Sequence, residues 1–142
     1  MKDISELTQR IREVNHSRGW GTEFTLETPS NPITAIALIS TEIGTELHEE
    51  LQKGDLEKAR IEIIDAMIRM LDLDALIARE HGEGLNLKLP ETDISAAAQA
   101  PTEEELLSLH VILSEAVQTW RAAAQPVIAL APVLQEAFSL CA

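Results

Sequence analysis

The chain has 142 residues, a length typical of one domain, and 45% of them are hydrophobic, which is enough to form a core. Its formal net charge of −13 argues against nucleic acid or an anionic membrane as a partner, because both require clustered Lys and Arg. The single cysteine, Cys141, excludes an intrachain disulfide, and the polar N-terminus does not read as a signal peptide. We therefore expect a cytoplasmic protein. Aromatic residues make up only 3%, while Ala, Leu, Ile and Glu dominate, which favours an all-α fold.

A first helix is predicted over residues 3–18 from apolar side chains at helical spacing, which are Ile4, Leu7, Ile11 and Val14. Arg10 and Arg12 are expected on the outer side of this helix. Glycines on both sides of Trp20 end it, and a loop is predicted over residues 22–31.

A helix hairpin is predicted over about residues 32–80. Asn31 and Pro32 are an N-cap and a first-turn proline for a helix that runs to about Lys53. Gly54 is a natural helix terminator, and Asp55 is a good N-cap for the helix that follows, from Leu56 to about Glu80. A turn this short predicts that the two helices run antiparallel.

Two rows of charged side chains face each other across this hairpin: Glu42, Glu46, Glu49 and Lys53 on the first helix, and Glu62, Asp65, Arg69 and Asp72 on the second. Equal rise along both helices puts Glu46 level with Glu62. Glu42 is then level with Asp65. Four or five carboxylates are therefore expected to converge on one patch.

Apolar residues flank the second row on both sides, with Ile61, Ile64, Ile68, Leu71 and Ala75 on one side and Ile63, Ala66, Met70, Leu73 and Ile77 on the other. A helix that is apolar nearly all round is expected to be buried. Buried carboxylates without a counterion cost several kcal/mol or more. We therefore predict a divalent cation at this patch, and its oxygen ligands favour Mg²⁺, with Mn²⁺ as a possible substitute, over zinc.

The acidic segments resemble a known signature. Glu46-Leu-His-Glu49, twelve intervening residues and Glu62-Ile-Ile-Asp65 are similar to the ExxE…ExxD signature of the MazG-like, all-α nucleoside triphosphate pyrophosphohydrolases. The flanking ELQKGD and IRMLDL, and the Gly19-Trp20 pair, are similar to the phage and bacterial MazG-like branch. The resemblance covers about Ile4 to Glu80.

This resemblance implies a Mg²⁺-dependent hydrolase that cleaves a nucleoside triphosphate between its α and β phosphates, releasing the monophosphate and pyrophosphate. It implies that Glu46, Glu49, Glu62 and Asp65 are the catalytic metal ligands. The register of the hairpin adds Glu42 as a further candidate ligand. The resemblance also implies a homodimer or homotetramer with the nucleotide site at the subunit contact. Which base and sugar are accepted does not follow from the sequence.

Several other residues have two interpretations each. Trp20 either stacks on the nucleobase, as the resemblance implies, or packs on the core or a dimer contact. Arg69 is either a phosphate clamp or a salt-bridge partner of Asp65 or Asp72. Asp72 itself is either a water-mediated outer ligand or a contact to the sugar.

The remaining candidates lie at the ends of helices. Asn15 and His16 could bind base or ribose, although a solvated helix end is the simpler interpretation for His16. Lys53 is either solvated or steers phosphates. Glu50 falls within the apolar stripe and is expected to reach solvent, with an additional ligand role as the alternative.

The C-terminal third contains no chemical motif. Residues 85–101 are predicted to connect the metal- and nucleotide-binding core, residues 1–80, to C-terminal helices over residues 102–142. Thr102 to Glu105 is a capping box for a helix that runs to about Ala124, with core candidates Leu106, Leu109, Val111, Leu113 and Val117. Pro126 and Pro132 divide the rest into one or two short helices. We expect these helices to complete the bundle and to make oligomer contacts.

Two other functions are alternatives to this hypothesis. An oxygen-reactive di-metal carboxylate bundle requires Glu-x-x-His pairs, and none occurs among the acids of the hairpin. A non-catalytic helical protein, either an adaptor or a nucleotide-binding sensor, is the alternative that keeps the same fold.

Overall fold

The computed structural model describes residues 2–19, 31–91 and 100–142, and these are mostly helical, which confirms the all-α prediction. The long elements are α1 (Ser5–Ser17), α2 (Asn31–Thr41), α4 (Leu56–His81), α5 (Glu103–Ala122) and α6 (Pro126–Cys141). A π-helical turn, η1 (Glu42–Leu47), and α3 (His48–Lys53) follow α2 directly. Two short strands, β1 (Lys2–Asp3) and β2 (Lys88–Leu89), form an antiparallel pair.

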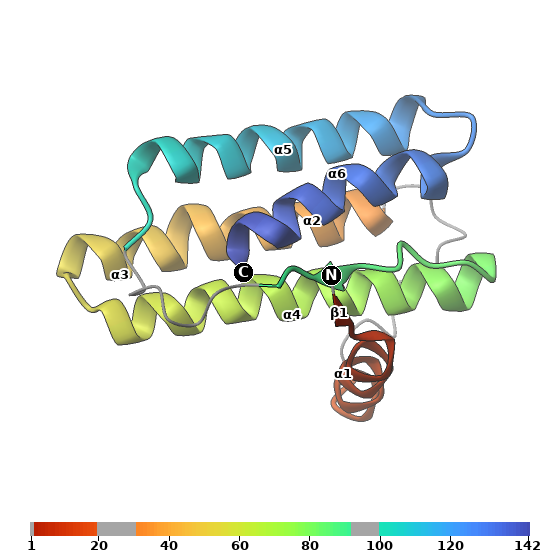
Figure 1. Cartoon of the computed structure of the whole chain (residues 1–142), viewed down its shortest axis with the longest axis horizontal. Coiled ribbons are helices and arrows are strands. Elements are labelled where there is room, and N and C mark those ends of the chain that lie inside the picture. The colour runs from red at the N-terminus through yellow and green to blue at the C-terminus, as the bar shows by residue number, and fades with distance from the viewer. Residues whose placement is uncertain (1, 20–30, 92–99) are drawn as a thin grey trace.

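The predicted hairpin is present. The elements α2, η1 and α3 form one unbroken helical rod, which ends at Gly54, and α4 returns beside it (Figure 1). Gly54 adopts a left-handed φ of 75°, a conformation that glycine reaches without steric cost. The Asp55 side chain accepts a hydrogen bond of 3.1 Å from the Lys58 backbone N–H, which caps α4. The π-helical turn η1 was not predicted.

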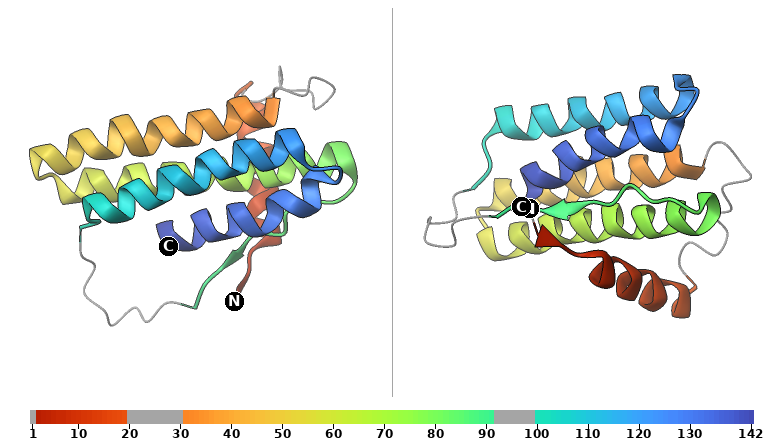
Figure 2. Two further views of the ribbon diagram at one scale, coloured as in Figure 1. Left: turned by 90° about the horizontal axis from the view of Figure 1, so that it is seen from above. Right: turned by 45° about the vertical axis from the view of Figure 1, so that its right-hand side comes forward.

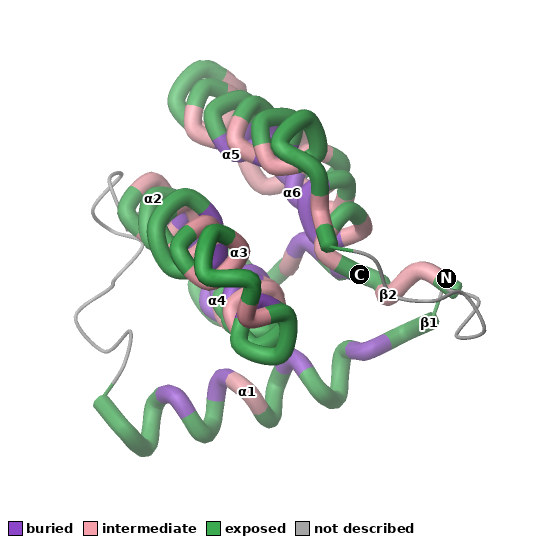
Figure 3. Tube along the Cα trace, turned by 90° about the vertical axis from the view of Figure 1, so that its left-hand side faces the viewer, coloured by how far each residue is buried: buried purple, intermediate pink, exposed green. Residues whose placement is uncertain are grey.

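Helices α5 and α6 form a second layer over this hairpin (Figures 1 and 3). Between the layers, the rod of α2, η1 and α3 and the helices α4, α5 and α6 all contribute fully buried side chains. They include Ile39, Leu47, Met70, Ile77, Leu113, Leu130, Leu134 and Phe138. Thr102 and Glu105 make both hydrogen bonds of a capping box at the start of α5, as predicted. Pro132 lies inside α6 without dividing it. Val111, predicted to be core, is 50% exposed, because it lies on the outer side of α5.

Helix α1 crosses α4 on the side opposite α5 and α6 (Figure 3). The face that it turns toward α4 contains Ile4, Thr8, Arg12 and Asn15, which are all buried. The predicted inner residues Leu7 and Val14 are 49% and 43% exposed, and the prediction that Arg12 points outward is wrong. The reason is that α4 presents the carboxylate of Asp72 to α1, so α1 is rotated to bring a cation to it.

Residues 85–89, predicted to begin the connection, are held against the bundle. The Asp74 carboxylate accepts hydrogen bonds from the backbone N–H groups of Leu85, Asn86 and Leu87, at 2.6, 3.2 and 2.9 Å. The Gln135 side chain of α6 accepts from the Lys88 N–H at 2.7 Å and donates to the Lys88 carbonyl at 2.9 Å, so it extends the two-stranded sheet. The two termini consequently lie close together (Figure 2).

The prediction that α4 is buried nearly all round is correct only for part of the helix. Ala66, Met70, Leu73 and Ile77 are buried, but Ile61 and Ile64 are 55% and 53% exposed. Helix α1 packs against α4 around Asp72, beyond these two isoleucines. In the described ranges, no helix combines the length and the apolar character that a membrane crossing requires.

Candidate metal centre

Three carboxylates from the two arms of the hairpin meet at one point. Glu42 of η1 and Glu62 and Asp65 of α4 each offer one oxygen, and these oxygens all lie within 4.8 Å of one another. The Glu42 side chain is only 12% exposed, Glu62 is half-buried and Asp65 is exposed. The cluster is therefore sheltered on the η1 side and open to solvent on the α4 side.

Glu62 is at the electrostatic centre of this cluster. Burial raises the pKa of the Glu62 carboxyl, and the negative charges of Asp65, Glu42, Glu46 and Glu50 raise the same pKa further. Each of these neighbours therefore disfavours the ionised form of Glu62. A cation bound among them would relieve this repulsion.

Arg69 already supplies one positive charge. Its Nε donates a hydrogen bond of 2.7 Å to Glu42 Oε1, across the two arms of the hairpin. The salt-bridge partner expected from the sequence was Asp65 or Asp72, but Asp72 is bound by Arg12. The Arg69 side chain is 44% exposed, so it can leave Glu42 without being extracted from the core.

The acids on η1 and α3 differ in how far they are exposed to solvent. Glu46 is exposed, although its charge still acts on Glu62. Glu49 has a side chain that is 59% exposed, with one oxygen 3.9 Å from Lys53 Nζ. The Glu50 side chain is only 13% exposed, and its Oε1 lies 3.3 Å from the same Lys53 nitrogen. The structure thus turns Glu50 inward, against the expectation that it reaches solvent, and leaves Glu49 at the surface.

The predicted substrate contacts are dispersed. Lys53 is exposed at the end of α3, and its pKa is raised, first by the hydrogen bond to Glu50 and then by the charges of Glu50, Glu49 and Glu46. Asn15 is buried at the α1–α4 contact, and His16 is exposed beside it. Trp20 lies outside the described residues.

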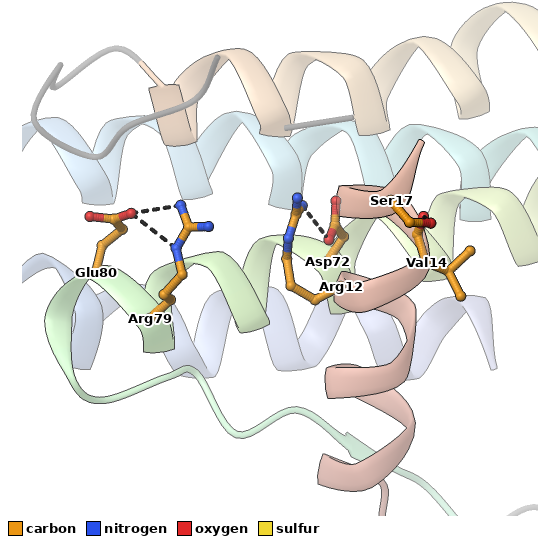
Figure 4. A network of polar contacts seen from close by, with 6 residues as sticks. All are labelled: Arg12, Val14, Ser17, Asp72, Arg79 and Glu80. Atoms are coloured by element: carbon orange, nitrogen blue, oxygen red, sulfur yellow. Dashed lines mark hydrogen bonds and ion pairs between the residues drawn. The ribbon is translucent and has the colours of Figure 1, made fainter. Parts of the chain in front are cut away.

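Asp72 does not lie within the three-carboxylate cluster. Its Oδ1 accepts a hydrogen bond of 2.8 Å from Arg12 Nη1, as Figure 4 shows, while Arg79 and Glu80 pair with each other farther along α4. Sequence reasoning missed Arg12, and the available signal was weak: one basic residue next to an apolar one, Ile11, in an amphipathic helix. Asp74, also missed, is a structural acid, because backbone N–H groups bind both of its oxygens.

The cluster suits a small, hard cation. Carboxylate oxygens are the ligands that Mg²⁺ prefers, at about 2.0–2.1 Å, so two of them on one ion are at most about 4.2 Å apart. The oxygens of Glu42, Glu62 and Asp65 already lie within 4.8 Å of one another, so small side-chain rotations would bring them to that spacing. A cation there would also compete with Arg69 for Glu42.

Comparisons with known proteins identified no relative of this chain. The chain matches no protein-family model, and searches of curated proteins and of solved structures also found no match.

Proposed function

We propose that the chain is a Mg²⁺-dependent nucleoside triphosphate pyrophosphohydrolase that converts a nucleoside triphosphate to the monophosphate and pyrophosphate. The observation that carries the proposal is the convergence of Glu42, Glu62 and Asp65 within 4.8 Å, from the same two helices that contain the ExxE and ExxD segments. Glu46 and Glu49 are included in the proposed metal-binding set because the MazG-like resemblance assigns them there.

The charge balance supports a ligand of high positive charge. The charges of Glu42, Glu46, Glu50 and Asp65 all act on Glu62. Within the described part of the chain, only two of these five carboxylates have a cation beside them: Arg69 pairs with Glu42, and Lys53 pairs with Glu50. Divalent metal provides the missing charge and, when bound, neutralises triphosphate oxygens and lowers the pKa of a coordinated water. This is how an acidic protein would bind an acidic substrate.

Individual residues of the chain would then have different roles in the reaction. Glu62 and Asp65 hold the cation on the α4 side. A carboxylate that the cation does not fully engage would accept the proton of the attacking water. Glu42 and Glu49 are the candidates for this base, and the position of Glu42 beside Glu62 and Asp65 favours Glu42. Arg69 would leave Glu42 and donate to phosphate oxygens of the substrate.

We also propose that the active form is a homodimer or homotetramer. Ile61 and Ile64 on α4 flank Glu62 and Asp65 and are more than half exposed, and Leu7 and Val14 of α1 are exposed as well. A second subunit over the two isoleucines would bury apolar surface and exclude water from the open side of the acidic cluster. Sedimentation equilibrium of the full chain, compared with an Ile61→Lys variant, tests this part.

Pyrophosphate release from a panel of ribo- and deoxyribonucleoside triphosphates tests the activity. We expect turnover with Mg²⁺ or Mn²⁺ and none with EDTA. Glu62→Gln and Asp65→Asn should each lower turnover at least a hundredfold without changing the helical circular dichroism. Glu136→Gln, which removes one exposed carboxylate from α6, is the matched control. No turnover with any triphosphate, together with no stabilisation by Mg²⁺, would instead favour the non-catalytic adaptor.

A further inference from the structure

The π-helical turn η1 lies in the middle of the acidic row, and a histidine from the other layer packs on it. A Cβ placed on Gly44 would lie 2.9 Å from His110 Cε1 and 3.2 Å from Nε2, so the imidazole of α5 lies directly on the Gly44 backbone. His110 Nδ1 is also 3.2 Å from Ser40 Oγ, one turn earlier. A side chain at position 44 would thus displace the ring.

A π-helical turn changes which acids share a face. It contains one more residue than an α-helical turn, so every later position is rotated by about one residue, roughly 100°. In an uninterrupted α-helix Glu49 would lie about 20° from Glu42, and Glu50 about 80° away. With the extra residue, Glu50 occupies the direction that Glu49 would otherwise have.

The environments of the two acids agree with this rotation. The Glu50 side chain is 13% exposed and the Glu49 side chain 59%. The Glu50 Oε1 lies 3.3 Å from Lys53 Nζ, while its Oε2 is buried and accepts no hydrogen bond from the described residues. Burial of a carboxylate oxygen without a donor is costly, and a cation would satisfy it.

We propose that Glu50, rather than Glu49, is the carboxylate of α3 that binds the metal. The π-helical turn η1 turns Glu50 inward, and His110 is the positioning residue that maintains this turn. This inference rests on the proposed function and replaces Glu49, which the resemblance assigns to the metal-binding set, with Glu50. The rotation is local, because only the six residues of α3 separate η1 from the turn at Gly54. If η1 returned to α-helical geometry with all of its residues kept, Glu49 would therefore rotate inward without any rebuilding of α4.

Mn²⁺ affinity, measured by electron paramagnetic resonance on the full chain, tests the assignment. We expect Glu50→Gln to weaken Mn²⁺ binding at least tenfold and Glu49→Gln to weaken it less than threefold, with Glu136→Gln as the control. The two substitutions are then repeated in a His110→Ala background. There the order should reverse, because Glu49 takes the inward position. A purely structural role of His110 would lower both affinities without reversing the order.

His110→Gln keeps a hydrogen-bonding group for Ser40 and provides a second background if His110→Ala does not fold. In this background the wild-type order of the two affinity losses should be preserved.

A larger loss of Mn²⁺ affinity from Glu49→Gln than from Glu50→Gln in the wild-type background would overturn this inference and leave the proposed function intact. An unchanged order in the His110→Ala background would overturn the role of His110. Mn²⁺ binding with the expected order but without pyrophosphate release would support the inference and overturn the proposed activity. No Mn²⁺ binding by the wild-type chain would overturn both.

Discussion

Arg12 of α1 and Asp72 of α4 form an ion pair of 2.8 Å whose side chains are only 10% and 20% exposed. This pair sets the rotation of α1, since it turns a polar face toward the bundle and leaves Leu7 and Val14 at the surface. Removal of one partner from such a pair leaves a charge without compensation, which is more costly than removal of both.

Arg12→Ala should therefore lower the free energy of unfolding by about 3 kcal/mol, the lower end of the range for a broken buried pair, because both side chains keep some exposure. The exposed residue Arg10 on the same helix provides the control, and Arg10→Ala should change it by less than about 0.5 kcal/mol. Urea denaturation followed by circular dichroism measures both. The double variant Arg12→Met with Asp72→Leu should recover part of the loss. Equal effects of the Arg12 and Arg10 substitutions would show that the pair does not position α1.

The Asp74 carboxylate should stabilise the segment after α4. Asp74→Ala leaves the N–H groups of Leu85, Asn86 and Leu87 without this acceptor, and two of these residues are buried. We expect a loss of about 2–4 kcal/mol in unfolding free energy, since each unsatisfied buried donor costs about 1–3 kcal/mol. Amide hydrogen exchange should accelerate at residues 85–87 first. Glu83→Ala, an exposed neighbour, is the control, and similar exchange in both variants would contradict the assignment.

Glu62 should destabilise the metal-free protein at neutral pH. Its pKa in the folded chain is raised above the ordinary value of 4.5, first by burial and then by neighbouring carboxylates, so the native state binds this proton more tightly than the unfolded state. Ionised Glu62 therefore destabilises the folded state fully at pH values above its folded-state pKa. This destabilisation is lost as the pH falls through that pKa and the carboxyl becomes protonated. Glu62→Gln should raise the melting temperature at pH 7 in EDTA.

The gain from Glu62→Gln should be below about 1 kcal/mol, because the site is partly solvated. With Mg²⁺ the wild-type chain should have a higher melting temperature than Glu62→Gln, because the wild type gains more stability from the bound cation than the variant does. Differential scanning calorimetry with EDTA and with Mg²⁺ separates the two effects. A lower melting temperature for the variant in EDTA would show that Glu62 has a favourable partner in the free protein.

Cys141 should react slowly in the folded protein. Burial raises the pKa of its thiol from 9.0 to about 12, and the thiolate is the reactive form. Alkylation by iodoacetamide at pH 8 should therefore be at least tenfold slower than in urea, as mass spectrometry would measure. Equal rates in both solvents would mean that the C-terminal end of α6 opens readily.

Local sequence signals predicted the hairpin and its caps. Gly54, Asp55 and the Thr102–Glu105 capping box specify helix ends through backbone conformation and hydrogen bonds within a few residues, so no tertiary information was needed. The antiparallel register predicted that Glu42 lies level with Asp65, and these two acids do meet. Glu46, predicted to lie level with Glu62, is not part of the three-carboxylate cluster. These parts of the fold and of the candidate site depend on short-range geometry.

Features determined by contacts between distant residues were not predicted. The rotation of α1 depends on Asp72, sixty residues away along the chain, and a hydrophobic pattern favoured the opposite face. The π-helical turn lies where His110 packs on Gly44, and neither residue signals it alone. The ordering of residues 85–89 needs Asp74 and Gln135 together. The assignment of Glu49 and Glu50 depends on that turn, and it is therefore the least local part of the site.

The most direct test of the metal centre is an anomalous-scattering map of crystals grown with Mn²⁺. We expect a peak within about 2.0–2.6 Å of carboxylate oxygens from both Glu62 and Asp65, with Arg69 released from Glu42. The peak should disappear in crystals of Glu62→Gln. No peak at the hairpin, or a peak at another acidic surface with Glu62 and Asp65 unoccupied, would contradict a metal centre formed by these two residues.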